Sequence, residues 1–257
     1  MPPPKRRLVV VAAALVLAGL LSAIFPAAAS AQAPREAAGY APKQAFGIFT
    51  AYSNDSSHML LGYAARRKLF DLGLSYNRRI VSSRVVSWQY SGELMPVALE
   101  SDPVQVLTYT YTLTNPPGTE QQTFREETLG ACHDVSGSGK VPDLYSYTFS
   151  GTCSRRWTIG TAMSPAGLQW NFLPRHRLQP FADGHGGYLF TTRPIPVEGA
   201  GSFNFTFDLG AGVEWFRTAS RSMRLEYRYH HISNKNTAPE NPGIDSGLFQ
   251  LSYTFEH

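Results

Sequence analysis

The most regular stretch of the chain is residues 203–215, where large apolar side chains alternate with polar or small ones. Phe, Leu, Ala, Val and Trp occupy the odd positions, whereas Asn, Thr, Asp, Gly and Glu occupy the even ones. An alternation with a period of two predicts a β-strand with one apolar and one polar face. Its thirteen residues exceed the usual strand of a soluble protein and suit a tilted strand that spans a bilayer.

The same alternation recurs, less regularly, along most of the chain. It predicts eight strands, near residues 46–52, 70–77, 86–91, 157–172, 179–192, 203–215, 223–233 and 247–255. An even number of strands fits the closure of a single-chain bacterial barrel. The predicted fold is therefore all-β, an eight-stranded antiparallel transmembrane β-barrel. The alternative is a soluble lipocalin-type barrel, whose apolar faces would point inward around a ligand.

The links between these strands differ in length. Three are short, near residues 78–82, 173–178 and 217–221, whereas those after the first, third and seventh strands are longer. Short periplasmic turns and long extracellular loops are typical of outer-membrane barrels. The third link, residues 97–156, contains two strand-like stretches and is predicted to be an extracellular loop with a hairpin insertion.

The N-terminus has the layout of a secretory signal peptide, with basic residues, an apolar run and then small residues up to position 31. We predict cleavage before Gln32, so that residues 1–31 are the signal peptide and 32–257 form the outer-membrane barrel; an uncleaved membrane anchor is the alternative.

Removing the leader leaves 23 − 3 = 20 basic against 19 acidic residues. This balance gives no electrostatic case for nucleic acid as a partner.

Cys132 and Cys153 are the two cysteines of the chain, and both lie in the long third link. A cysteine pair in an exported protein is most simply a disulfide. With His133 they would form an incomplete ligand set for zinc, and no metal or other cofactor is expected.

Candidate chemistry gathers on the seventh predicted strand. Its residues 223, 225, 227 and 229 form the apolar, lipid-facing set, and His231 and Ser233 continue the same parity at the outer end. Asp245 shares the lipid-facing parity of the adjacent strand, where it can reach the second imidazole nitrogen. A serine hydroxyl needs an adjacent base to become a nucleophile, and a carboxylate orients that base. The three residues therefore predict an acyl-transfer triad on the outer wall.

The stretch from Tyr227 to Asn234, with its His-x-Ser-Asn motif, and the stretch from Asn241 to Ser246 resemble the signature of the lipid A 3-O-deacylases, also called the PagL or acyloxyacyl hydrolase group. The resemblance implies an eight-stranded bacterial outer-membrane barrel that hydrolyses the 3-O-linked hydroxyacyl ester of lipid A. It assigns Ser233 as nucleophile and His231 as base. It places Asp245 where the type member has a glutamate, and Asn234 beside the developing oxyanion.

Several alternatives stay open at this point. His230 could be the base instead of His231, and Glu240 could replace Asp245 as the orienting carboxylate. The whole chain could also be a non-catalytic structural or adhesive barrel, in which the motif only shapes an outer loop. The expected partners are lipid A or lipopolysaccharide of the outer leaflet and the membrane itself, and the question of a homodimer is left open.

Overall fold

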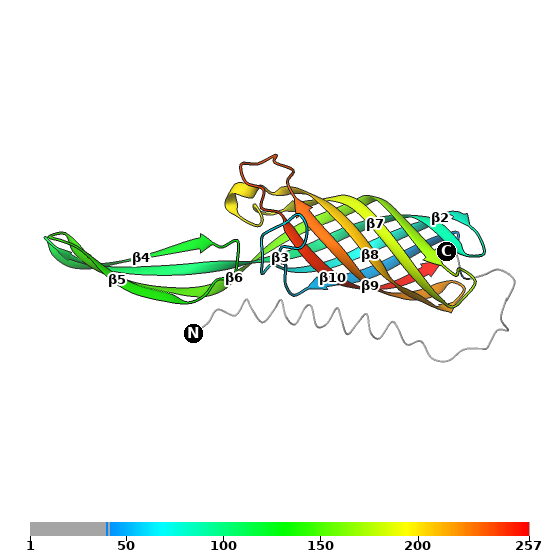
Figure 1. Ribbon diagram of the computed structural model, residues 1–257, viewed down its shortest axis with the longest axis horizontal. Coiled ribbons are helices and arrows are strands. Elements are labelled where there is room, and N and C mark those ends of the chain that lie inside the picture. Colours follow the sequence, from blue (N-terminus) through cyan, green and yellow to red (C-terminus); the bar gives the residue numbers. More distant parts are fainter. Residues whose placement is uncertain (1–39, 41, 257) are drawn as a thin grey trace. The chain divides into compact units, whose positions relative to one another are not determined.

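The computed structural model describes residue 40 and residues 42–256 (Figure 1), so the predicted signal peptide, residues 1–31, lies outside the described part. The described residues form ten strands and one short 3-10 helix. These are β1 (Gln44–Ser53), β2 (Lys68–Ser82), β3 (Val86–Thr114), β4 (Pro117–Glu127), β5 (Val135–Val141), β6 (Tyr145–Phe172), β7 (Leu178–Thr191), η1 (Glu198–Ala200), β8 (Phe203–Thr218), β9 (Arg221–Ser233) and β10 (Ile244–Glu256). Within this part of the chain, no helix is long and apolar enough to cross a membrane.

Eight of these strands close into an antiparallel barrel. Around the barrel, β1 pairs with β2, β2 with β3 and β3 with β6, after which β6 to β10 pair in sequence and β10 returns to β1. The predicted number of barrel strands and their antiparallel order are confirmed. β7, the fifth strand of the barrel, presents Gly184, Gly186 and Tyr188 to the outside and His185 to the inside.

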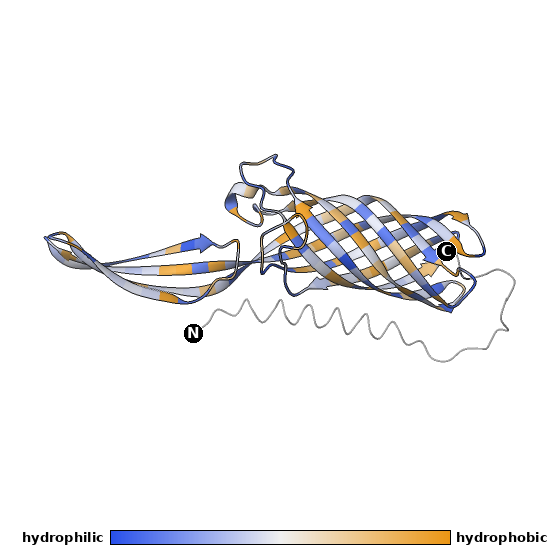
Figure 2. Ribbon diagram, viewed as in Figure 1, coloured by the Kyte–Doolittle hydropathy of each residue, from blue (hydrophilic) through white to orange (hydrophobic). Residues whose placement is uncertain are grey.

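Hydrophilic and hydrophobic residues alternate along the barrel strands (Figure 2), and the burial of the hydrophilic ones gives the barrel a polar interior and an apolar exterior. The inward side chains include buried ions, among them Glu93, Asp183, Glu226 and Arg228, whereas exposed outward positions carry large apolar residues such as Phe249. Arg228 lies 2.9 Å from Glu93 and 2.7 Å from Glu226, so the charges of these three residues compensate one another in the interior. This facing fits a barrel surrounded by lipid and is the reverse of a lipocalin, whose interior is apolar.

The two ends of the barrel have links of different lengths. At one end the links are residues 83–85, 173–177 and 219–220; at the other they are 54–67, 192–202 and 234–243, together with the extension of β3 and β6. Short links at one end and long ones at the other are the pattern predicted from the sequence. We refer to the end with long links as the outer end, in keeping with other outer-membrane barrels.

The third link is built differently from a loop set on the barrel, because β3 and β6 continue past the barrel as one long antiparallel pair. Outside the barrel, β4 flanks this pair on the free edge of β3, and β5 flanks it on the free edge of β6 (Figure 1). Pro103 is tolerated in β3 because β2 stops pairing at Ser101 and β4 starts at Val104, so no partner on that edge needs its missing N–H. Cys132 and Cys153 form the predicted disulfide here.

Aromatic side chains stabilise this outer extension. Tyr109 on β3 stacks on Phe149 of β6 with ring centroids 5.5 Å apart, and Tyr111 lies 5.6 Å from Tyr145. Cross-strand aromatic pairs of this kind strengthen a sheet that has no second layer.

Pro165 lies in β6 at a bulge. The register of β6 shifts beside it against both neighbours, between Tyr90 and Glu93 on β3 and between Met163 and Ala166 towards β7. A residue at a bulge is left unpaired in the hydrogen-bond ladder, so the missing N–H of the proline is not needed there. The strand can therefore continue through Pro165.

Candidate functional site

The predicted pair of His231 and Asp245 lies at the outer end of the barrel. The register of β9 and β10 sets the two residues directly opposite each other. The imidazole Nδ1 of His231 donates a hydrogen bond of 2.7 Å to Oδ1 of Asp245. A carboxylate only accepts, so the hydrogen is on Nδ1, and Nε2 is left as the free acceptor that a general base needs.

Asp245 faces outward like Phe249 and Leu251 of β10, yet it is completely buried. Its Oδ1 also accepts a hydrogen bond of 2.8 Å from the hydroxyl of Tyr229. Its Oδ2 accepts from the backbone N–H groups of Leu60, at 2.7 Å, and Leu61, at 2.8 Å. Four donors therefore fix this carboxylate and favour its ionised form.

Ser233 follows His231 on the same face of β9, and both residues line an outer groove of about 410 Å³. The groove is also lined by residues of three neighbouring strands and by Lys235 of the next link. The strand residues are Pro165 and Ala166 of β6, Gly186, Gly187 and Tyr188 of β7, and Phe205, Thr206 and Phe207 of β8. In the described structure the Ser233 hydroxyl makes no hydrogen bond to the imidazole. Such contacts are often formed only once substrate is bound.

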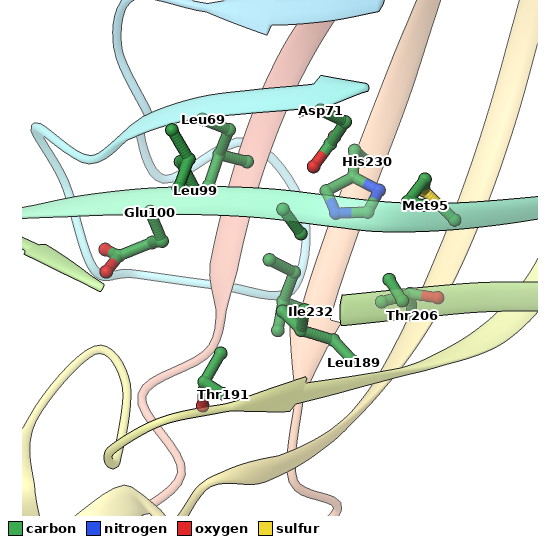
Figure 3. Close-up of a pocket in the computed structure, with 12 residues that line it drawn as sticks. Leu69, Asp71, Met95, Leu99, Glu100, Leu189, Thr191, Thr206, His230 and Ile232 are labelled. Carbon is green, nitrogen blue, oxygen red and sulfur yellow. The ribbon is translucent and has the colours of Figure 1, made fainter. Parts of the chain in front are cut away.

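The residues next to His231 and Ser233 face the barrel interior. His230 and Ile232 line a small cavity of about 20 Å³ there, together with Asp71 and Met95 (Figure 3). His230 is buried, and its Nδ1 is hydrogen-bonded to Asp208 of β8. The structure thus separates the two histidines of the motif, with His231 at the outer groove and His230 in the interior.

Asn234 is buried directly after Ser233, and all its donors are engaged. Its side-chain nitrogen donates to the backbone oxygens of Ala200 and, at 2.6 Å, Glu240. Its backbone N–H donates to Oδ1 of Asn241 at 3.1 Å. The oxyanion role predicted for Asn234 would require one of these bonds to break, and the arrangement seen here instead joins the outer links 192–202 and 234–243.

Glu240, the alternative orienting carboxylate, does not approach the imidazole. It is exposed and lies against Gly199, whose backbone oxygen accepts a hydrogen bond of 2.9 Å from Glu240 N.

Two contributors to the site were missed by the sequence analysis. Strand parity assigns Tyr229 only to the apolar face of its strand, although a hydroxyl two residues before His231 on the same face is a usable signal. The amides of Leu60 and Leu61 could not be foreseen, because they come from a link whose path the strand pattern does not determine.

The fold and the site together define a class of protein, an outer-membrane-type barrel with a histidine–carboxylate pair and a serine on its outward wall. The chain belongs to the lipid A 3-O-deacylase (PagL) family, since the model of that family matches residues 116–254, more than half of the chain. Family membership places the protein among outer-membrane enzymes that act on lipid A.

Comparisons with solved structures give barrels of low sequence identity. The outer membrane enzyme PagL is 13% identical, with a TM-score of 0.46, covering 82% of this chain and 99% of that one. Neisserial surface protein A is 10% identical, with a TM-score of 0.42, covering 84% and 97%. OprG from Pseudomonas aeruginosa is 9% identical, with a TM-score of 0.40, covering 85% and 99%. None of the curated proteins compared with the chain matches it.

Proposed function

We propose that this protein is a serine esterase that removes the 3-O-linked hydroxyacyl chain of lipid A, with Ser233 as nucleophile, His231 as base and Asp245 as the orienting acid. The observation that carries the proposal is the 2.7 Å hydrogen bond between His231 and Asp245 on the outward wall, beside a groove that also contains Ser233. An ester that is already in a membrane would meet this wall without leaving the bilayer.

The chemistry follows from the free Nε2 of His231. This nitrogen takes the Ser233 proton as Oγ attacks the acyl carbonyl, and Asp245 stabilises the imidazolium that forms. When the tetrahedral intermediate collapses, the sugar oxygen leaves with that proton and the acyl group stays on Ser233. Water, deprotonated by the same imidazole, then releases the hydroxy fatty acid and restores the serine.

The groove supports a lipid substrate. Tyr188, Phe205 and Phe207 give it apolar walls, and its volume of about 410 Å³ is in the range of small-molecule sites. Lys235 also lines it and would supply a cation for a phosphate of lipid A. Asn234 enters the proposal as the residue that fixes the chain after Ser233.

We further propose that residues 1–31 direct export, that residues 32–257 are the mature outer-membrane domain and that residues 97–156 lie outside the cell. The active groove would then face the outer leaflet, where lipid A resides.

Mass spectrometry of lipid A tests the proposed function. Expression of the wild type in a bacterial host whose lipid A carries a 3-O-hydroxyacyl chain is expected to remove the mass of one hydroxy fatty acid. Ser233→Ala, present in the outer membrane in equal amount, is expected to leave the lipid A intact. Equal loss in both strains would exclude Ser233 as nucleophile, and loss in neither would favour a structural barrel or another lipid substrate.

A further inference from the structure

The link between β1 and β2 contains a segment, residues 57–64, that we call the leucine loop. It is bonded along its length to the start of β10. Backbone N–H groups of Ser57, Tyr63 and Ala64 donate to the oxygens of Asp245, Pro242 and Gly243, respectively, at 3.0–3.1 Å. The backbone of the loop is thus fixed to the barrel.

The leucine loop lies over the outward face of β10. Asp245 belongs to the outward set of that strand, and yet none of its surface is exposed, because the Leu60 and Leu61 amides cap its carboxylate. A segment that covers an outward-facing side chain must itself lie on the outside of the barrel wall.

Gly62 makes this close approach possible. A Cβ at this position would come within 2.8 Å of the backbone nitrogen of Asp245 and of the backbone carbons of Gly243 and Ile244. Any side chain here would push the loop away from the barrel and from the carboxylate.

The four large side chains at the tip of the loop are mostly apolar, and no other part of the described structure covers them. Leu60 is 70% exposed and Leu61 is 64% exposed, and Met59 and Tyr63 beside them are exposed as well. Contiguous apolar surface of this kind marks a site of contact with another apolar phase. It adjoins the lipid-facing wall, where Tyr52 of β1 and Phe249 of β10 are paired in register and exposed.

We propose that the leucine loop is embedded in the outer leaflet, where Met59, Leu60, Leu61 and Tyr63 contact the acyl chains of the surrounding lipids. The same backbone that holds these side chains in the lipid holds Asp245 towards His231. Contact with lipid therefore favours the loop position that orients the base, so that the esterase is most active when it is surrounded by lipid; this second part rests on the function proposed above.

Spin-label accessibility tests whether the loop is in the lipid. Both native cysteines are in the disulfide, so Leu60→Cys can be labelled selectively with a nitroxide. The matched control is Leu144→Cys, because Leu144 is 60% exposed but lies in the link between β5 and β6. Leu144 lies next to Thr114, at the far end of the β3–β6 extension. This end is about 40 Å from Ser101, where β3 stops pairing with β2, at roughly 3.3 Å per strand residue.

In vesicles of phosphatidylethanolamine and phosphatidylglycerol, we expect the Leu60 label to collide more with oxygen, which concentrates in hydrocarbon, than with a water-soluble nickel chelate. The Leu144 label is expected to show the opposite preference. A Leu60 label that behaves like the Leu144 label would overturn the proposal. The measurement needs no hydrolysis, so its result does not depend on whether Ser233 is the nucleophile.

A ratio of activities tests the link to catalysis. The double variant Leu60→Ser/Leu61→Ser keeps both backbone amides, and we expect its kcat/KM for lipid A in vesicles, relative to that for p-nitrophenyl butyrate in detergent, to fall about tenfold. Leu144→Ser should leave this ratio unchanged. An unchanged ratio in the double variant, whether both activities are lost equally or neither is lost, would mean that the loop does not couple lipid contact to catalysis.

Discussion

Replacement of His231 with alanine is expected to lower kcat for lipid A deacylation by at least about 10³-fold, because Ser233 then has no base to take its proton. The loss should appear in kcat more than in KM, since the groove that would bind the acyl chain is unchanged. Steady-state kinetics on lipid A in mixed micelles measures both. Retained heat-modifiable mobility on electrophoresis would show that the variant barrel is folded.

The neighbouring histidine provides the matched control for this experiment. His230 differs from His231 by one position, and its imidazole is buried in the barrel interior against Asp208. His230→Gln is therefore expected to affect the stability of the barrel and to leave kcat of the folded fraction largely intact. Activity retained in His231→Ala but lost in folded His230→Gln would make His230 the base and contradict the proposed site.

Asp245→Asn is expected to lower kcat by roughly 10²- to 10⁴-fold with little change in KM. The carboxylate accepts hydrogen bonds on both oxygens, from His231 and Tyr229 on one and from Leu60 and Leu61 on the other. An amide replaces one of those acceptors with a donor, so one pair of partners must meet an N–H group. Either the imidazole loses its orientation or the loop leaves the site.

Tyr229→Phe separates the role of the whole carboxylate from that of a single hydrogen bond. It removes one of the four donors to Asp245 and keeps the bond from His231. We expect a reduction in kcat of only about tenfold, near the lower end for the loss of one hydrogen bond to a charged group, because three donors still hold the carboxylate. Equal losses in Tyr229→Phe and Asp245→Asn would show that the tyrosine hydroxyl, rather than the histidine–carboxylate pair, is the essential partner.

The shorter side chain at position 245 fits the observed register. Directly opposed residues on antiparallel strands have Cβ atoms about 4.5–5.5 Å apart, which an aspartate and an imidazole can bridge without a further methylene. Since His231 and Asp245 are such a pair, the aspartate carboxylate reaches the imidazole without the further methylene that a glutamate would have.

The barrel was predictable because each wall residue faces either lipid or the polar interior, and that choice repeats every second residue. The same parity placed His231, Ser233 and Asp245 on the outward face. A hairpin in the third link was predictable, but the unbroken course of β3 and β6 was not, since Pro103 and Pro165 suggest that the strands end there. The structure instead has an unpaired strand edge at Pro103 and a bulge at Pro165.

The rest of the site depends on links, whose paths no periodicity fixes. The leucine loop reaches Asp245 through backbone amides, which leave no mark in the sequence apart from Gly62 and an unusual run of apolar residues in a polar link. Asn234 illustrates the reverse case, in which a residue singled out by a motif turns out to have its donors engaged by Ala200, Glu240 and Asn241.

The central claim is that Ser233, activated by His231, is the nucleophile on the outward wall, and covalent labelling tests it most directly. An alkyl fluorophosphonate reacts with an activated serine as Oγ displaces fluoride and the base takes up the proton. Peptide mass spectrometry of the treated protein in detergent should find the phosphonyl adduct on Ser233, none in His231→Ala, and deacylation of lipid A lost as the adduct forms. Full labelling of another residue, or complete deacylase activity with Ser233 modified, would contradict the account.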